Sequence, residues 1–410
     1  MPVRARLSAF LQAGTGAGVA LLLAACGGTS APASAPVSSP ASTAASAPAS
    51  AAPSNVAAPT VSASAAASSS STASSAAGSA SASAPAAAKP AASGAVGSVK
   101  YATQGRPDEA PFQIAVARGY FAQAGVNVET VRIDSGSQMV PALATNQVQV
   151  GNGAPSAALY NAFNRGVNLR IVADYAHLGA PDDTSIALMV RKDLLDSGQV
   201  KAGADLKGRQ VAVSVAQGTI SDILMSSLAA KEKLPKIEVQ EQFMPFGDML
   251  QALASKKIDA AWFNEPLVSQ AKAQGIAGVL VPGGALLPGA ELSVLYYSPQ
   301  FAAEQPQAAT GFMVAYLKGV RDYWDAFRDN KGRAEAIQLL TQTTALKDPK
   351  VWESFPPPYT DLNGRVNLDD LQSQAQAYGK FGSLQGGVPD VSKYVDTKFA
   401  DAAVQQLGKR

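Results

Sequence analysis

The sequence predicts an α/β protein of two lobes joined by two crossover strands. The first observation is the alternation of helical and strand patterns between Pro111 and Val172, with short connections that favour parallel strands and right-handed crossovers. The second is the length of 410 residues, which exceeds what one compact core usually holds. The third is the pair of apolar strand patterns at 185–191 and 292–297, which are suited to carry the chain into a second lobe and back.

The first predicted helix begins at Pro111, because proline lacks an N–H that the first helical turn does not need. Ile114, Ala117 and Phe121 share one apolar face. Gly125 ends the helix, since glycine adopts the left-handed conformation at little cost. The next expected elements are a strand at 126–131, a helix that begins at 135–137, a strand at 147–150, a helix that begins after 151–155 and a strand at 169–172.

The second lobe is expected at 186–290, and the first lobe at 98–185 plus 291–410. Strands at 211–213, 258–263 and 279–281 and helices around Leu224, Leu228, Met249 and Leu253 fill the second lobe. Helical patterns follow from residue 305 through Trp324, at 367–380 and at 395–407. We expect these C-terminal helices to brace the first lobe.

Residues 1–26 have the parts of an export signal. Arg4 and Arg6 precede an apolar run that is too short to span a membrane comfortably. The run ends in Leu23-Ala24-Ala25-Cys26, which resembles a bacterial lipobox. We therefore expect export and a lipid on Cys26, with the protein periplasmic or on the outer face of the cytoplasmic membrane. An ordinary cleaved signal with an incidental cysteine is the alternative.

Residues 27–97 are predicted to be a disordered tether. Apart from Asn55 and Lys89, the tract holds only Ala, Ser, Pro, Gly, Thr and Val. It therefore lacks the large apolar side chains that would compensate the entropy of ordering. A chain of this length spans roughly 45–50 Å on average.

Composition excludes several classes of site. The formal charge is +2, which Arg4 and Arg6 supply, so no basic face for nucleic acid is expected. His177 is the one histidine and Cys26 the one cysteine, which argues against a zinc site and a disulfide framework. We expect a monomer without cofactor or metal.

Three turns precede predicted helices, at 107–111, 135–137 and 151–155. Such turns gather at the carboxyl ends of parallel strands, where ligands bind. Helix N-termini there offer free N–H groups and partial positive charge. Alternatively, the glycines in these turns are simply what short connections require.

An ordered series of short motifs resembles the periplasmic substrate-binding proteins of ABC importers, in particular the group related to sulfonate- and thiamine-precursor-binding proteins. The motifs are Ala117-Arg118-Gly119-Tyr120-Phe121, Ala124-Gly125-Val126-Asn127-Val128, Gly136-Ser137, Gln147-Val148-Gln149-Val150-Gly151, Arg165-Gly166, Asp205-Leu206-Lys207-Gly208-Arg209, Gln217-Gly218-Thr219 and Ile258-Asp259-Ala260-Ala261. The resemblance covers about residues 98 to 300. It implies a periplasmic-binding-protein fold (type II-like), a small-molecule solute held between the lobes and a membrane permease as partner.

The candidate solute contacts lie in turns of both lobes. In the first lobe they are Gln104, Phe112, Gly136, Ser137, Gly153, Ala154 and Tyr175. In the second lobe they are Gln217, Gly218, Thr219, Ser221, Asn264 and Glu265. The N–H groups and hydroxyls at Gly136-Ser137 and at Gly218-Thr219 suit a carboxylate or sulfonate. Ordinary helix capping is the alternative for Ser137, Thr219 and Glu265, and an incidental surface position is the alternative for His177.

The predicted function is delivery of a small polar organic solute, sulfonate-like or pyrimidine-like, to an ABC importer, with inorganic anions also open. A sensor or adhesion lipoprotein is a second possibility. An enzyme of thiamine-pyrimidine synthesis is a third, but that branch of the family uses a cysteine-rich cluster, whereas this chain has Cys26 alone. No catalytic residue is predicted.

Overall fold

The computed structural model describes residues 97–133, 136–214, 217–344, 346–354 and 358–410. The predicted export signal, including Cys26, and the predicted tether as far as residue 96 lie outside the described residues. The first described element, β1, begins at Gly97, the last residue of the tract expected to be a tether.

The first sheet has the order β2-β1-β3-β10-β4. Its strands are β1 (Gly97–Thr103), β2 (Val126–Arg132), β3 (Val150–Gly153), β4 (Arg170–His177) and β10 (Glu291–Tyr297). β1 pairs in parallel with β2 and β3, but β10 lies antiparallel between β3 and β4. The strands β1, β2, β3 and β4 therefore run parallel to one another, as the pattern between Pro111 and Val172 predicts, and β10, which enters from the other lobe, runs in the opposite direction.

The second sheet has the order β7-β6-β8-β5-β9. Its strands are β5 (Ile186–Arg191), β6 (Gln210–Ser214), β7 (Gln240–Phe243), β8 (Ala260–Asn264) and β9 (Ala277–Pro282). β5 is antiparallel to both neighbours, as β10 is in the first sheet. The chain crosses between the sheets at 178–185 and 283–290. These crossings confirm the two-lobed α/β fold.

The helices follow the predicted order with shifted boundaries. They are α1 (Ala110–Ala117), α2 (Tyr120–Gln123), α3 (Gly136–Ala144), α4 (Ala157–Asn164), α5 (Lys192–Asp196), α6 (Ile220–Lys231), α7 (Phe246–Ala254), α8 (Leu267–Ala273), α9 (Pro299–Glu304), α10 (Pro306–Phe327), α11 (Arg333–Thr343), α12 (Pro349–Ser354), α13 (Leu368–Lys380) and α14 (Lys398–Leu407), with short 3-10 turns η1 (Pro107–Glu109), η2 (Gly203–Leu206), η3 (Gly283–Ala285) and η4 (Val391–Tyr394). The helix expected from Pro111 to Gly125 is split, because Gly119 takes a left-handed φ of 69°. The strand expected at 147–150 begins only at Val150, after a turn.

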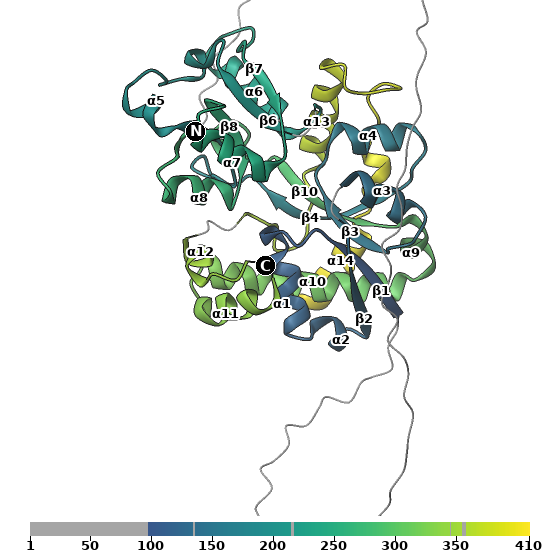
Figure 1. Cartoon of the computed structure of the whole chain (residues 1–410). Coiled ribbons are helices and arrows are strands. Elements are labelled where there is room, and N and C mark those ends of the chain that lie inside the picture. The colour runs from purple at the N-terminus through teal and green to yellow at the C-terminus, as the bar shows by residue number, and fades with distance from the viewer. Residues whose placement is uncertain (1–96, 134–135, 215–216, 345, 355–357) are drawn as a thin grey trace, which may run out of the picture. The chain divides into compact units, whose positions relative to one another are not determined.

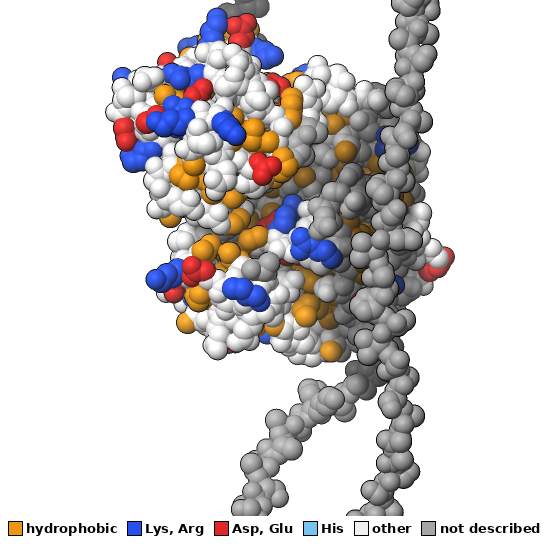
Figure 2. All heavy atoms as spheres, viewed as in Figure 1, with side chains coloured by type: hydrophobic (Ala, Val, Ile, Leu, Met, Phe, Trp, Pro, Cys, Tyr) orange, Lys and Arg blue, Asp and Glu red, His pale blue; other side chains and the backbone are white. Residues whose placement is uncertain are grey.

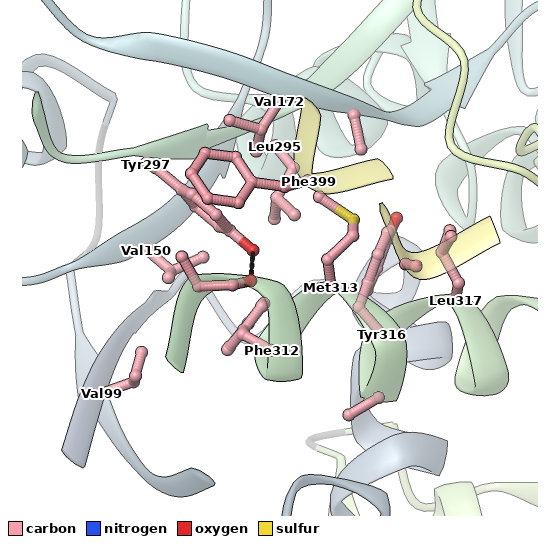
Figure 3. Packing of buried hydrophobic residues seen from close by; sticks show 14 of the residues in the cluster. Val99, Val150, Val172, Leu295, Tyr297, Phe312, Met313, Tyr316, Leu317 and Phe399 are labelled. Atoms are coloured by element: carbon pink, nitrogen blue, oxygen red, sulfur yellow. Dashed lines mark hydrogen bonds between the residues drawn. The ribbon is translucent and has the colours of Figure 1, made fainter. Parts of the chain in front are cut away.

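The first lobe is a sheet covered on both faces by helices (Figure 1). On one face, α1, α10 and α14 bury Phe112, Phe312 and Phe399 against the sheet. Figure 3 shows part of this cluster, where the Tyr297 hydroxyl donates to the Ala309 carbonyl at 2.8 Å. On the other face, α3, α4 and α13 bury a second cluster that includes Tyr378. The C-terminal helices α13 and α14 therefore brace the first lobe, as predicted.

The second lobe has its own core on both faces of its sheet. Leu224 and Leu228 of α6 pack with Trp262 on one face, and Met249 and Leu253 of α7 line the other. No helix among the described residues is long and apolar enough to cross a membrane. Figure 2 shows basic and acidic side chains intermixed at the upper left, over the second lobe, with hydrophobic side chains between them.

Candidate functional site

The two lobes meet where the turn before α6 touches the start of α4. The N–H of Ala157 donates to the Gly218 carbonyl at 2.9 Å. Gly218 has a left-handed φ of 82°, and a Cβ there would lie 2.5 Å from the Cβ of Ala157. The contact therefore requires glycine at position 218, for conformation and for space. It joins the second-lobe turn to the carboxyl end of β3 in the first lobe.

The N–H groups predicted to hold an anion at this turn are already bonded. The Asp222 Oδ2 atom accepts the N–H of Gly218 at 2.6 Å and the N–H of Thr219 at 3.0 Å. The expectation of free N–H groups at Gly218-Thr219 is therefore wrong, because a carboxylate three residues into the helix occupies them. The sequence carried this signal, since an acidic residue at the third helical position is a capping pattern.

The polar side chains of the same turn differ in accessibility. Ser221 is buried, and Thr219 is half-buried with its Oγ1 enclosed and without a partner among the described residues. Gln217 is exposed. Of the predicted contacts in this turn, Gln217 is thus the side chain most open to a solute.

A cavity of about 340 Å³ lies beside the junction and is lined by both lobes. The second lobe contributes Val213, Gln217, Asp222, Met225, Ser226, Ala229, Pro235, Lys236, Ile237 and Glu241, and the first lobe contributes Phe381 and Ser383. This volume is at the small end of the usual range for ligand sites, about 300–1,000 Å³. Met225, Ile237 and Phe381 provide an apolar wall, and Gln217 and Asp222 provide a polar end. Phe381, which follows α13, was not among the predicted contacts.

The first-lobe loop after β1 also satisfies its own polar groups. The buried Glu109 accepts the hydroxyl of Thr103 and, at 2.8 Å, the N–H of Gln104. Arg106 and Asp108 form an ion pair at 2.6 Å. Burial raises the pKa of Glu109, which the bonds from Thr103 and Gln104 partly oppose. Gln104 is half-buried at the start of this loop.

Two aromatic residues predicted to contact solute belong to the first-lobe core. Phe112 is fully buried, and its ring stacks on Tyr101 with centroids 3.7 Å apart. Tyr175 is also fully buried; its hydroxyl pairs with that of Tyr101 at 2.9 Å, and its ring stacks on Tyr316. Both predictions are corrected, because the two rings are packed within the core that the first sheet forms with α1 and α10, and they leave no surface for a solute.

The remaining first-lobe candidates lie in two turns. Gly136 and Ser137 begin α3, and residues 134–135 just before them lie outside the described residues. Gly153 is buried, and its carbonyl accepts the Tyr296 hydroxyl at 3.1 Å. Ala154 is exposed at the end of β3, close in sequence to the junction at Ala157. The hydrogen bond between Ala157 and Gly218 thus brings the turn between β3 and α4 to the 217–222 turn.

Glu265 lies at the carboxyl end of β8, after the exposed Asn264. Its carboxylate accepts the N–H of Ser269 at 3.0 Å and the Ser269 hydroxyl at 2.9 Å. Burial raises the pKa of Glu265 to about 7, although both bonds from Ser269 act to lower it. This geometry agrees with the alternative interpretation, in which the Glu265 carboxylate caps the first turn of α8.

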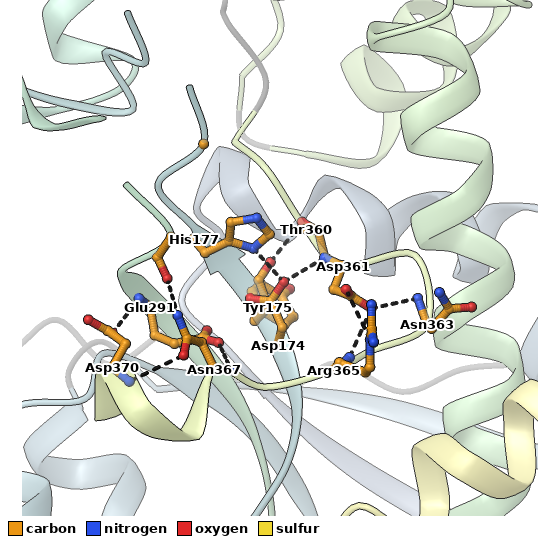
Figure 4. Close-up of polar contacts among 12 residues, drawn as sticks. Asp174, Tyr175, His177, Glu291, Thr360, Asp361, Asn363, Arg365, Asn367 and Asp370 are labelled. Carbon is orange, nitrogen blue, oxygen red and sulfur yellow. Dashed lines mark hydrogen bonds and ion pairs between the residues drawn. The ribbon is translucent and has the colours of Figure 1, made fainter. Parts of the chain in front are cut away.

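His177 belongs to a polar cluster where the chain leaves and re-enters the first lobe (Figure 4). Its Nδ1 lies 2.8 Å from Oδ2 of the buried Asp174. Glu291 is also buried, and a second cavity of about 320 Å³ is lined by His177, Gly289, Glu291, Asp361, Arg365, Val366 and Asn367. Sequence reasoning missed Asp174 and Glu291, although a charged residue within an apolar strand pattern was a usable signal. Among the described residues, no group of three or more His, Cys, Asp or Glu is placed to hold a metal ion.

Solved structures share this fold at low sequence identity. The periplasmic aliphatic sulphonate-binding protein SsuA of Escherichia coli matches with a TM-score of 0.59 and 19% identity, over 73% of this chain and 92% of that one. The periplasmic nitrate-binding protein NrtA of Synechocystis PCC 6803 matches with a TM-score of 0.59 and 16% identity, over 76% of this chain and 89% of that one. These likenesses establish the periplasmic-binding-protein fold.

A curated relative and a family model extend the likeness to sequence. A protein of Brachyspira hyodysenteriae, described as an ABC transporter periplasmic binding protein, is 30% identical over 192 residues, which cover 45% of this chain and 54% of the relative. The chain thus spans about half the length of the curated relative that it matches. The family model described as NMT1/THI5 like matches residues 106–326, more than half of the sequence. The chain therefore belongs to the NMT1/THI5-like family.

Proposed function

We propose that this protein is a lipid-anchored solute-binding protein that delivers a small polar organic solute to an ABC importer. The observation that carries the proposal is the cavity of about 340 Å³ lined by both lobes beside the junction of Gly218 and Ala157. A solute there touches both lobes, so its binding energy favours the arrangement in which they meet. The description of the Brachyspira hyodysenteriae relative as a periplasmic binding protein supports the same function.

The mechanism is binding with lobe closure. The two crossing segments at 178–185 and 283–290 are the connections about which the lobes rotate. Binding breaks no bond, and the closed form docks on a permease in the membrane. The protein is exported, acts as a monomer and is held at the membrane by a lipid on Cys26, with the tract from residue 27 as a flexible spacer.

The experiment is native mass spectrometry of the full chain purified in mild detergent, followed by uptake of the identified solute in cells lacking the protein. A bound small molecule and reduced uptake support delivery. Bound solute with unchanged uptake overturns delivery and favours the sensor alternative. A failure of every solute tested to bind or to raise the melting temperature overturns solute binding itself.

A further inference from the structure

The turn before α6, where the two lobes meet, is capped by a carboxylate of the protein itself, that of Asp222. An oxyanion site at a helix start depends on N–H groups that point at the ligand without another partner. Here the N–H groups of Gly218 and Thr219 both donate to Asp222. In the first lobe, Glu109 occupies the N–H of Gln104 in a comparable way. Each lobe therefore fills a turn with one of its own carboxylates.

The charged side chains around the cavity also disfavour an anionic solute. Asp222 and Glu241 line the cavity, together with one lysine, Lys236, and both Glu241 and Lys236 are exposed. An oxyanion at Gly218 and Thr219 would have to displace Asp222 and remain beside its negative charge. Like charges a few ångströms apart repel strongly where water is partly excluded. The same carboxylate attracts a cation or accepts a hydrogen bond from an uncharged donor.

We infer that Asp222 determines solute specificity by closing this turn to oxyanions, so that the cavity takes an uncharged or cationic solute with hydrogen-bond donors. The inference rests on the proposed function and names the substrate class of the same cavity. SsuA and NrtA, which share the fold, are described as sulphonate- and nitrate-binding. Asp222 excludes solutes of that kind from this cavity, because it occupies the N–H groups that would bind them.

Asp222 also caps a helix, and a matched residue separates the two roles. Asp205 in η2 accepts the N–H of Lys201 at 2.8 Å and the N–H of Ala202 at 3.0 Å, the same arrangement with the same spacing. Asp205 is exposed and does not line the cavity. Asp205→Ala therefore removes an equivalent cap without opening the junction.

The test is calorimetric titration of the full chain with ethanesulfonate and with nitrate, for wild type, Asp222→Ala and Asp205→Ala. We expect wild type and Asp205→Ala to bind both probes more weakly than about 1 mM. Asp222→Ala frees the N–H groups of Gly218 and Thr219. Each can then donate a charge-assisted hydrogen bond to the probe anion, and one such bond is strong enough to raise the affinity at least about tenfold. Thermal unfolding of the same samples checks that both variants are folded.

Two results overturn the inference: tight binding of ethanesulfonate or nitrate by wild type, and a folded Asp222→Ala variant with no gain in affinity. If Asp222→Ala does not fold, Asp222→Asn serves, because its amide oxygen still accepts the N–H groups while the charge is gone. We then expect a smaller gain of about threefold, and no gain overturns the inference. Tight sulfonate binding by wild type leaves the proposed function standing, so the two failures are distinguishable.

Discussion

The carboxyl group of Glu291 on β10 lies near that of Asp174 on the neighbouring strand β4, where β10 enters the sheet of the first lobe (Figure 4). Both residues are buried, with at most 1% of their surface exposed. One oxygen of each carboxyl group accepts a hydrogen bond: Glu291 Oε1 accepts the Asn367 N–H at 2.6 Å, and Asp174 Oδ2 accepts the Asp361 N–H at 2.5 Å. The remaining oxygens, Glu291 Oε2 and Asp174 Oδ1, are buried and have no hydrogen-bond partner among the described residues. Burial raises the pKa of Glu291, and the nearby charge of Asp174 raises it further.

Glu291→Gln is expected to remove a pH-dependent loss of stability. Because the folded-state pKa of Glu291 is raised, the folded protein keeps a proton that the unfolded chain releases near pH 4.5. The free energy of unfolding of wild type therefore falls as pH rises above that value, by up to about 1.4 kcal/mol per pH unit, until the folded pKa is reached. Glutamine is uncharged at every pH, so burial beside the charge of Asp174 costs it less, and the variant should be more stable than wild type at pH 8.

The measurement is urea unfolding at several pH values between 5 and 8, at intervals of about one unit. Glu304→Gln is the matched control, since Glu304 is an exposed helix residue whose carboxylate accepts a hydrogen bond from the Gln300 side chain. It should leave the pH profile of wild type unchanged. A Glu291→Gln profile as steep as that of wild type would show that Glu291 is already ionised in the fold.

Glu265 should titrate near neutrality. Burial raises its pKa to about 7, so its carboxyl group is about half protonated at pH 7. Asp193 is the comparison, because its hydrogen bond with Arg191 lowers its pKa to about 2. Side-chain carboxyl carbon shifts measured by NMR should therefore move near pH 7 for Glu265 and stay constant above about pH 4 for Asp193. A Glu265 midpoint below 5 contradicts this assignment.

Gly218→Ala should destabilise the junction more than an otherwise similar substitution. Gly208 also has a left-handed φ, 74°, but a Cβ there would meet nothing within 4 Å. Gly208→Ala then costs about 1–2 kcal/mol for backbone conformation alone. At Gly218 the added Cβ also collides with Ala157, which should add about 1–3 kcal/mol. Chemical unfolding measures both, and equal losses would show that the lobes do not meet at this point in solution.

The sequence was sufficient for most of the fold and for little of the site. Periodicity and β-branched residues located β2, and Gly125 ended the preceding helix with a φ of 74° as expected. The antiparallel insertion of β10 was not predictable from local pattern, because register between distant strands depends on how the second lobe returns the chain. The position of Asp222 at the third residue of a helix indicated that it caps that helix. The sequence did not show that the N–H groups it accepts are those of Gly218 and Thr219, which were expected to bind the solute.

Phe112 illustrates the same limit. Its position next to the first turn suggested a solute contact, but a helix turns its side chains about 100° per residue, and Phe112 points into the core. Only its stacking on Tyr101 reveals this. The charges of Asp174 and Glu291 within apolar strand patterns were visible in the sequence, but their proximity was not, since they lie on strands that are distant in sequence.

Phe112→Ala and Phe381→Ala should separate stability from affinity. Phe112 is fully buried, so its removal should lower the free energy of unfolding by about 3–5 kcal/mol. Phe381 is 43% exposed and lines the cavity at the junction, so its removal should change stability by less than about 1 kcal/mol. It should instead weaken binding of the solute that co-purifies with wild type by roughly fivefold. Unaltered affinity in Phe381→Ala would place the solute elsewhere.

Cys26→Ala should release the protein from the membrane. The prediction is motivated by Leu23-Ala24-Ala25-Cys26, which resembles a lipobox and would place the lipid on Cys26. Under the proposed lipidation, attachment depends on the acyl chain, of which each buried methylene contributes about 0.8 kcal/mol. Thr29→Ala, three residues further along and outside the lipobox, is the control and should stay with the membrane. Cell fractionation after labelling with a radioactive fatty acid measures both membrane attachment and lipid modification. A wild-type protein without label would contradict lipidation. A Cys26→Ala variant that stays in the membrane fraction would show that another segment is the anchor.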